Sequence, residues 1–502
     1  MKLFARAIAA LVFALCHVGA ASAQCVSPSQ PITQSELNSE IAACLPDNVQ
    51  GLVSPFIMRQ VLTDMTAAQT LGASALNVKA FGAVCDGTTD DTVAIQAAIS
   101  ASELINGVPV YLPGFCAITS SLNVTAYTAI VGNGPNSGIR PPVTVTAFAI
   151  NTQASVYMAN FAIIYPSAAN SGTAAISVTA GSGQENVGSL FNALTITFSN
   201  YGINFIKASK FTVSNCIIDG VNQNAIAIQN ANAGDSGDST VYANNIGTVG
   251  GAAIYWASSG GIRISNNKIN VAPVGIQIAL ASGVTTTGIY IIGNSIEGIS
   301  PSVGLTGSGA AIQLGRQGTT GNLLTVIIAG NELVGNYGVY APTDMTGAWL
   351  TGLTINGGTF AGNPGVTTYA VNVDSITGIQ VSGVNIQPSI GGATTGVVTG
   401  SAATQGSVGP NSCSSSCSAD SIASSTIARL GPGQINIPGP VIGTNLVANA
   451  ATPTSAAGQV AFGNTTSGAG SGNCPTGTVG GKSVGGCLVI SIGGVTYYVP
   501  VF

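Results

Sequence analysis

The sequence is poor in charge. Only 6% of its 502 residues are charged, while 46% are hydrophobic and 67 are glycine. Without Lys2 and Arg6, which lie in a predicted leader, ten basic residues remain against 17 acidic ones, a net charge near −7. Nucleic acid and anionic membrane surfaces repel such a chain, so neither is expected as a partner. A neutral or patchily charged glycan fits better, and the uncharged polar surface is typical of long stacked β-structures.

Histidine is almost absent. The only one, His17, lies in the predicted leader, so the mature chain has none. A serine or cysteine nucleophile with a histidine base is therefore excluded. A zinc site that mixes cysteine with histidine is excluded for the same reason. Any chemistry must come from carboxylates or from a basic side chain.

The first 23 residues are typical of a signal peptide. A short apolar run, Ala7 to Val18, follows two basic residues and ends at Ala21-Ser22-Ala23, the pattern that a signal peptidase cleaves. No later segment reaches the roughly 20 apolar residues that span a bilayer. We expect cleavage before Gln24, secretion to the extracellular space, periplasm or cell surface, and no membrane attachment.

Nine cysteines remain after the leader, and eight of them form four pairs that are close in sequence. An exported protein would oxidise such pairs. We therefore predict disulfides between Cys25 and Cys44, Cys85 and Cys116, Cys413 and Cys417, and Cys474 and Cys487. The ninth, Cys216, lies in an apolar strand and is expected to be buried as a small hydrophobic residue.

The mature chain divides into four segments. Residues 24–75 are predicted to form a helical adaptor segment, because Ser35 and Ser54-Pro55 suit helix starts. Residues 76–390 are short β-branched runs broken by Gly and Asn. Residues 391–425, rich in Gly, Ser and Thr, predict a linker, and 426–502 predict a small β module.

The segment 76–390 contains a repeat. An Asn followed two residues later by an aliphatic residue recurs at spacings of 29, 23, 27 and 37, at Asn215, Asn244, Asn267, Asn294 and Asn331. Such repeats without helices predict a β-solenoid, in which coils stack about 4.8 Å apart because one coil cannot bury its Ile and Val alone. The Asn is expected to adopt left-handed backbone and to hydrogen-bond its neighbour in the next coil.

The start of this segment carries a resemblance. Asn77 to Ile99 reads NVKAFGAVCDGTTDDTVAIQAAI, and Val108 to Pro113 reads VPVYLP. Both resemble the opening of the pectate-lyase-like superfamily of rhamnogalacturonase-type, epimerase-like and tailspike proteins. The resemblance implies an all-β, right-handed parallel β-helix over 76–390, closed by a strand, a turn and a helix. Asp90 and Asp91 would then lie at the helix start, where carboxylates accept backbone N–H groups.

The resemblance also implies a carbohydrate-active protein that binds an extracellular polysaccharide and cleaves it as a glycoside hydrolase or a polysaccharide lyase. A second interpretation stays open: a non-catalytic, tailspike-like adhesive or structural protein, assembled as a homotrimer through its C-terminal module. Leu45 to Met65 and Leu488 to Phe502 are similar to segments of phage tail proteins. The lack of histidine and the scarcity of acids also favour this second interpretation.

Hydrolysis would need two carboxyl groups about 5 to 9.5 Å apart. We predict Asp219 as one of them, paired with Asp235 or Asp238 from the polar insertion at 231–240. Counted from the turn Asn, Asp219 and Glu297 lie on one side of the stack. They are three coils apart, however, or about 14 Å, which is too far for a pair.

Substrate binding is predicted for Arg263, Trp256 and Arg316. Elimination would use a basic residue and a cation; no resident cofactor or metal is expected, with calcium implied only for a lyase, at Asp235 and Asp238. Aromatic residues suited either to sugar stacking or to the core are Tyr255, Tyr290, Tyr337 and Tyr340. Lys268 and Glu332 follow their turn Asn directly, two coils apart, and could form a surface ion pair of little worth.

Overall fold

The computed structural model describes residues 75–436, with gaps at 106, 168–171, 181–183, 230–237, 281–283, 300–308, 316–320, 342–349, 401–402, 414–416, 419–420, 423–426 and 432–433, and also the strands within 478–501. The predicted signal peptide, the helical segment 24–75, and the side chains of Cys25, Cys44, Cys474 and Cys487 lie outside the described part. Predictions about them stay predictions.

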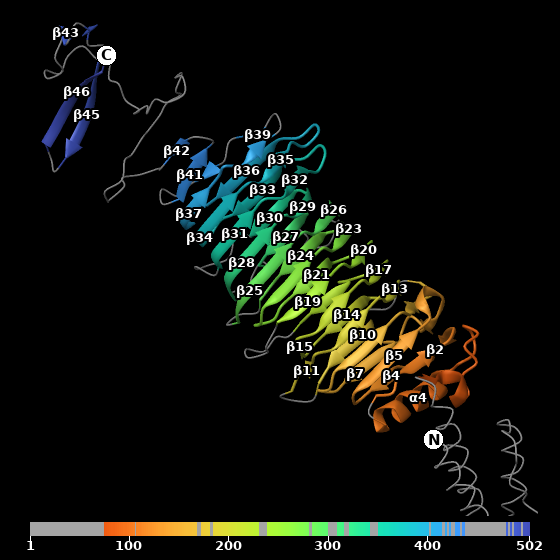
Figure 1. Cartoon of the computed structure of the whole chain (residues 1–502). Coiled ribbons are helices and arrows are strands. Elements are labelled where there is room, and N and C mark those ends of the chain that lie inside the picture. The colour runs from red at the N-terminus through yellow and green to blue at the C-terminus, as the bar shows by residue number, and fades with distance from the viewer. Residues whose placement is uncertain are drawn as a thin grey trace, which may run out of the picture.

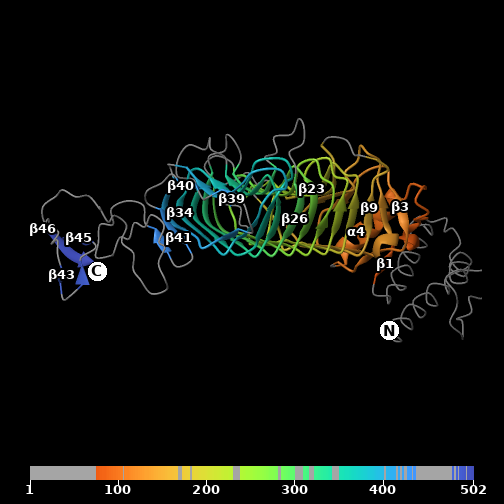
Figure 2. The ribbon, with the colours of Figure 1, turned by 90° about the horizontal axis from the view of Figure 1, so that it is seen from above.

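The described chain is a right-handed parallel β-helix in which each coil adds one strand to each of three sheets, A, B and C, in that order. In these three sheets every strand pairs in parallel with the equivalent strand of the next coil, except the last strand of sheet A, which pairs antiparallel with the strand before it. Figures 1 and 2 show the resulting prism, with the coils stacked along one axis. This confirms the predicted fold class.

Sheet A has 15 strands. They are β1 (Leu76–Asn77), β2 (Val110–Leu112), β5 (Thr128–Gly132), β8 (Val156–Ala159), β12 (Leu190–Asn192), β16 (Thr212–Ser214), β19 (Ser239–Tyr242), β22 (Ile262–Ser265), β25 (Thr285–Ile292), β28 (Asn322–Ala329), β31 (Leu350–Asn356), β34 (Thr377–Ser382), β37 (Thr404–Val408), β41 (Ile427–Gly431) and β42 (Gln434–Asn436).

Sheet B has 12 strands. They are β3 (Phe115–Ala117), β6 (Gly138–Arg140), β9 (Ala162–Ile164), β13 (Thr195–Thr197), β17 (Ile217–Asp219), β20 (Asn245–Ile246), β23 (Lys268–Ala272), β26 (Ser295–Ile299), β29 (Glu332–Gly335), β32 (Thr359–Gly362), β35 (Asn385–Gln387) and β38 (Ser412–Cys413).

Sheet C has 13 strands. They are β4 (Leu122–Val124), β7 (Phe148–Asn151), β10 (Ala174–Thr179), β14 (Tyr201–Phe205), β18 (Ile226–Ile228), β21 (Ala252–Trp256), β24 (Val274–Ile278), β27 (Ala310–Leu314), β30 (Tyr337–Ala341), β33 (Thr368–Val373), β36 (Thr394–Thr399), β39 (Cys417–Ser418) and β40 (Ser421–Ile422).

The remaining elements are short. They are η2 (Val78–Phe81), α4 (Thr92–Leu104), η3 (Gly134–Asn136), the parallel pair β11 (Asn186–Val187) and β15 (Ala208–Ser209), and the antiparallel pairs β43 (Thr478–Val479) with β44 (Lys482–Ser483) and β45 (Gly486–Ile492) with β46 (Val495–Val501). No helix among the described residues is long and apolar enough to cross a membrane.

The core is a set of aliphatic columns that run along the axis. In sheet B, for example, Ile218, Ile246 and Ile269 lie in register on successive coils, and all are fully buried. Each such side chain contributes about 1.5–3 kcal/mol of hydrophobic stabilisation when it leaves water. Because neighbouring coils share the column, no coil is stable alone.

A ladder of asparagines closes the corner between sheets A and B. Asn244, Asn267, Asn294 and Asn331 are buried at this corner. The Asn244 backbone N–H and Nδ2 both donate to Oδ1 of Asn267, at 3.0 and 2.9 Å, and the same two bonds join Asn267 to Asn294 and Asn294 to Asn331. The predicted hydrogen bonding between coils is therefore confirmed.

The left-handed backbone that the turn Asn was expected to tolerate occurs at Asn215 but not at the other four turn asparagines. It belongs to the residue before each ladder asparagine, such as Ala243 (φ 56°) and Asn266 (φ 55°). Asn215 has φ 55° and occupies the position on its coil that Ala243 occupies on the next one. The ladder position of that coil is therefore taken by Cys216, which is buried. The expected pairing of Asn215 with Ile217 is wrong by one residue: Ile217 is exposed and Ile218 fills the core.

The β-helix extends past residue 390. Strands β36, β37 and β41 pair in parallel with the coils before them, and β38 and β39 do the same. Residues 391–425 were predicted as a linker because they are rich in small residues. This was wrong for these strands, since small residues also suit the outer positions of a coil.

The first coils are closed by α4, which lies at one end of the prism in Figure 1. Its buried side chains include Ile95 and Ile99. The carboxylate of Asp90, one residue before the N-cap Asp91, accepts a hydrogen bond from the N–H of the first helical residue, Thr92, at 3.0 Å, as predicted for the helix start. Asp91 differs from the prediction, because its buried carboxylate accepts from the backbone N–H groups of the preceding loop rather than from the helix.

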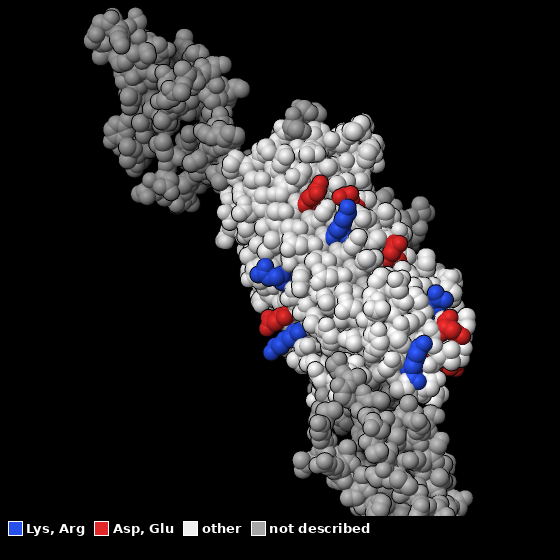
Figure 3. All heavy atoms as spheres, turned by 45° about the vertical axis from the view of Figure 1, so that its right-hand side comes forward, with Lys and Arg blue, Asp and Glu red and all other residues white. Residues whose placement is uncertain are grey.

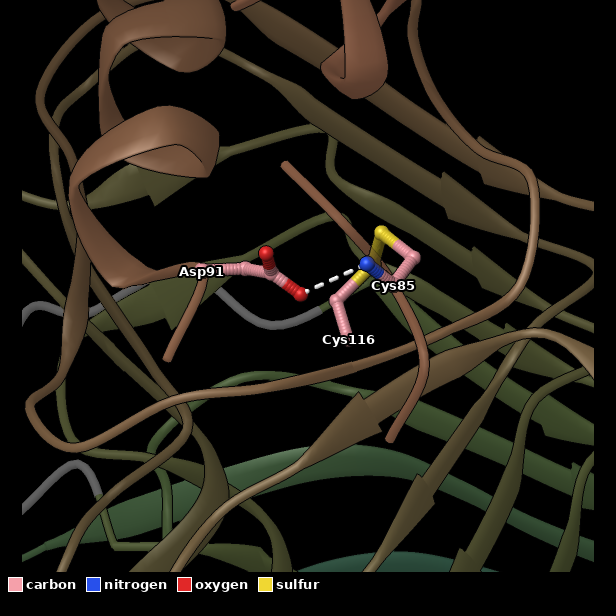
Figure 4. Close-up of side chains that lie close together, drawn as sticks. All are labelled: Cys85, Asp91 and Cys116. Atoms are coloured by element: carbon pink, nitrogen blue, oxygen red, sulfur yellow. Dashed lines mark hydrogen bonds between the residues drawn. A yellow bond between two sulfur atoms is a disulfide. The ribbon is translucent and has the colours of Figure 1, made fainter. Parts of the chain in front are cut away.

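A disulfide fixes that loop to the first coil. Cys85 is bonded to Cys116, as predicted, and Figure 4 shows the Asp91 carboxylate beside this bond, where it accepts from the Cys85 N–H at 2.9 Å. Cys413 is disulfide-bonded as well, with a partner side chain outside the described part, and Cys216 is a free buried thiol. Burial raises the pKa of the Cys216 thiol to about 12, so it stays protonated and inert.

The asparagine ladder predicts that loss of a single ladder side chain lowers the stability of the protein strongly. Asn267→Ala removes the acceptor of Asn244 and leaves buried polar groups on two coils unpaired, so we expect a loss of about 3 kcal/mol in unfolding free energy. Asn245→Ala, at an exposed position on the same corner, is the control and should change stability by less than about 0.5 kcal/mol. Urea unfolding followed by circular dichroism measures both. Equal midpoints for the two variants would contradict the role of the ladder.

The disulfide predicts a redox-dependent stability. It closes a segment with a sequence separation of 31, so replacing both Cys85 and Cys116 by Ser should cost about 3 kcal/mol. Thermal melts with and without reductant provide the check. Reductant should lower the midpoint of the native protein but cause a smaller shift in the double variant, and identical shifts in the two proteins would argue against a stabilising role.

Candidate functional site

Asp219, predicted as a catalytic acid, lies at the end of β17 on the outer face of sheet B. Its Oδ1 accepts a hydrogen bond from the Thr248 N–H of the next coil at 2.6 Å. Gly247 leaves the space for this contact, since a Cβ there would come within 2.2 Å of the same oxygen. The carboxylate therefore joins two turns, a structural role.

Asp238, its predicted partner, occupies a recurring bend at the start of sheet A. Its φ is 52°, and most positions in register with it also have left-handed backbone, Gly261 on the next coil excepted: Lys210, Gly288, Thr325, Gly352, Gly378 and Gln405. Aspartate tolerates this conformation better than most residues do. The residue type is thus explained by the bend without any catalytic role.

The two carboxylates do not meet. Asp219 ends a strand of sheet B, and Asp238 lies just before a strand of sheet A, so a strand of sheet C separates them. The intervening strand, β18, has three residues, about 10 Å at the usual rise per residue, and the turn residues 220–225 lie between β17 and β18 as well. Asp235 lies outside the described residues, so its pairing with Asp219 stays a prediction.

Two of the predicted substrate-binding residues are found elsewhere. Trp256 is fully buried in the core, which corrects its assignment to a binding surface. Arg263 is exposed on sheet A, and its guanidinium lies over the Tyr290 ring at 5.3 Å. Arg316 lies outside the described residues. The predicted site is therefore spread over different faces of the prism.

Sheet B carries a compact charged group that sequence reasoning did not select. Ser295 Oγ lies 3.1 Å from Glu297 Oε1 and 3.3 Å from Glu332 Oε2. Lys268 is beside Ser295 in the sheet register. Figure 3 brings the sheet B side of Figure 1 forward and shows a mostly uncharged surface with charged side chains in small groups.

The separation of these carboxylates suits acid–base chemistry. Since Glu297 and Glu332 contact one hydroxyl, their contacting oxygens are less than about 7 Å apart, an upper limit that includes the roughly 5 to 5.5 Å of retaining glycoside hydrolases. The signal was present in the sequence: Lys268, Ser295 and Glu332 each follow a ladder asparagine directly. From sequence, Glu297 was considered only as a partner for Asp219, which is three coils away.

Sheet C differs from the other two sheets. None of its strands contains Asp, Glu, Lys or Arg. Its outward positions instead carry amides and tyrosines, while the alternate positions are buried aliphatic residues. One outward column runs, in register, through Tyr255, Gln277, Gln313, Tyr340 and Asn372.

Three tyrosines form a half-exposed cluster on sheet C, here called the tyrosine cluster: Tyr337, Tyr340 and Tyr369. The Tyr337 ring lies 4.5 Å from that of Tyr340 and 5.4 Å from that of Tyr369, nearly parallel to the latter. These rings come from two successive coils and present an aromatic surface at the protein–water boundary. Tyr255 lies in the same column further along the axis and is also half-exposed.

Tyr337 is uncharged at neutral pH. Burial raises the pKa of the Tyr337 phenol above its ordinary value, and the adjacent Tyr369 raises it further because two phenolates would repel each other. The Tyr337 phenol therefore acts as a neutral hydrogen-bond donor and acceptor. Tyr337 and Tyr340 were proposed from sequence as stacking residues, but the third member, Tyr369, was missed because it lies 29 residues beyond Tyr340.

Comparison with known proteins gives one family match. Residues 75–300 match the family described as rhamnogalacturonase A/epimerase, pectate lyase-like. No curated protein matches the chain.

Several solved structures are similar. The A-module of mannuronan C-5 epimerase AlgE6 from Azotobacter vinelandii has a TM-score of 0.49 and 14% identity, covering 71% of this chain and 99% of that one. An exopolygalacturonase from Thermotoga maritima has a TM-score of 0.41 and 11% identity, covering 68% of this chain and 96% of that one. The Dettilon tailspike protein has a TM-score of 0.42 and 16% identity, covering 71% of this chain and 70% of that one. At these levels no functional argument follows, and the fold rests on the strand pairing above.

Adjacent residues of β21 separate core from surface. Trp256→Ala should lose about 3–5 kcal/mol of stability, because it leaves a large cavity. Tyr255→Ala, on the outward side, should lose far less. Chemical unfolding of both variants is the measurement. A Trp256→Ala variant as stable as Tyr255→Ala would contradict the buried position of the indole.

Proposed function

We propose that this protein is a carbohydrate-active β-helix protein that holds a polysaccharide along the outer face of sheet C, and the match of residues 75–300 to the pectate-lyase-like family supports this. The observation that carries the proposal is the tyrosine cluster of Tyr337, Tyr340 and Tyr369. Aromatic rings with a polar edge suit sugars, whose C–H faces are apolar and whose hydroxyls need hydrogen bonds.

The shape of the β-helix supports a polymeric ligand. Equivalent positions repeat at about 4.8 Å along the axis, so a chain molecule lying on sheet C meets side chains from many coils. Tyr255 and the tyrosine cluster lie on the same sheet, with the coils of Gln277 and Gln313 between them. A long glycan could contact both at once and gain affinity from several weak contacts.

We place the protein outside the cytoplasm. The Cys85–Cys116 disulfide supports this, because structural disulfides persist in oxidising compartments. The leader-like first 23 residues support it too. A homotrimer and a calcium requirement remain predictions from the resemblance.

Cleavage is a second candidate function, and one observation favours it. Glu297 and Glu332 share the Ser295 hydroxyl, so they lie near enough to each other for a hydrolytic pair. In such a pair one carboxylic acid protonates the glycosidic oxygen. The other carboxylate activates water or attacks the sugar. This pair replaces the predicted pair of Asp219 and Asp238.

Binding is tested through the tyrosines. Tyr337→Ala and Tyr340→Ala should each weaken polysaccharide binding about tenfold, through loss of ring contact worth about 1.4 kcal/mol. Tyr290→Ala, a tyrosine on sheet A, is the matched control and should bind normally. Affinity electrophoresis in gels that contain the polysaccharide measures all three. Equal weakening by Tyr290→Ala would contradict the assignment to sheet C.

Cleavage is tested through the acids. Glu297→Gln and Glu332→Gln should each abolish the release of reducing ends and leave binding unchanged, because only the acid–base chemistry is lost. Asp238→Asn serves as the control and should keep full activity. Loss of activity in Asp238→Asn with normal activity in both glutamine variants would refute the pair. No reducing ends from the native protein on any bound polysaccharide would leave a binding protein without this chemistry.

A further inference from the structure

We infer that the polysaccharide held on sheet C is uncharged, an inference that rests on the proposed function. The charged residues of the strands are divided unequally among the three sheets. Sheet C has none; sheet B has Arg140, Asp219, Lys268, Glu297 and Glu332; sheet A has Arg263 and Arg429. The sheet with the most surface tyrosine is thus the one without charge.

An anionic glycan would need compensation that the described strands of sheet C do not offer. Carboxylates of uronic acids bind tightly only where Arg, Lys or a cation pairs with them, because an unpaired charge loses its hydration on binding. Among the residues that the structure describes, one group of three potential metal ligands comes together: Cys85, Asp91 and Cys116. Both of its cysteines are in the disulfide, and it lies at the capped end rather than on sheet C.

The side chains that are present suit neutral sugars. Amide groups each supply donors and an acceptor, as sugar hydroxyls require. Gln277 and Asn372 are partly exposed in the outward column, on either side of the coils that carry Gln313 and Tyr340. Gln313, between them, is buried and donates to the Gly315 carbonyl at 3.0 Å.

The charged group on sheet B does not change this conclusion. Glu297 and Glu332 carry negative charge around Lys268, so they would repel rather than hold a polyanion that crossed from sheet C. The negative chain as a whole, near −7 without the leader, adds to that repulsion. Both effects leave a neutral glycan unaffected.

The test compares neutral with anionic polymers by affinity electrophoresis of the full chain. The probes are a β-glucan, an α-1,3-glucan and a galactomannan against polygalacturonate and alginate, each at low salt and at about 0.5 M salt, where exposed charge interactions are screened. We expect retardation by at least one neutral polymer, unchanged by salt. Tyr340→Ala should weaken it about tenfold, whereas Lys268→Ala should not.

Two other outcomes are distinguishable. Retardation by the uronate polymers alone, lost at high salt, would overturn the inference but leave the proposed function in place. Binding to none of the polymers would overturn the proposed function and the inference with it. A variant that misfolds is recognised by its unfolding midpoint, and Tyr340→Phe then replaces Tyr340→Ala, with binding retained because the ring remains.

Discussion

The parallel pairing of strands in successive coils is the constraint on which the rest of this structure depends. Parallel pairing sets each residue beside the equivalent residue about 4.8 Å away. Inward positions therefore become continuous aliphatic columns, such as Ile218, Ile246 and Ile269. Corner positions become ladders of buried amides. Outward positions become faces whose chemistry is uniform over many coils, and this is what makes a whole sheet a surface for one polymer.

Much of the fold could be predicted from the sequence, because the repeat records this pairing. The recurring Asn predicted the stacked coils and the hydrogen bonds between them, and the opening motif predicted the capping helix. The error at Asn215 has a local cause. The corner needs two residues, one left-handed and one buried, and asparagine suits either place, so a pattern match alone does not separate them. Composition misled at 391–425, where small residues build coils rather than a linker.

The candidate site was harder to predict, since it depends on which face each residue takes. Asp219 and Asp238 are close in sequence and were predicted to be close in space, but a strand of sheet C lies between them. Trp256 and Tyr255 are neighbours in sequence, yet one is core and the other surface, because a strand alternates its sides. The grouping of Tyr337, Tyr340 and Tyr369 required the register between coils, whose lengths vary and cannot be counted from one residue.

The central claim is that sheet C is the glycan-binding face, and hydroxyl-radical footprinting of the tyrosines tests it most directly. Mass spectrometry would compare oxidation of each tyrosine with and without a bound polysaccharide. The account predicts protection of Tyr337, Tyr340 and Tyr369, with Tyr242 and Tyr290 on sheet A unchanged. Protection of the sheet A tyrosines, with full oxidation of the tyrosine cluster, would contradict it.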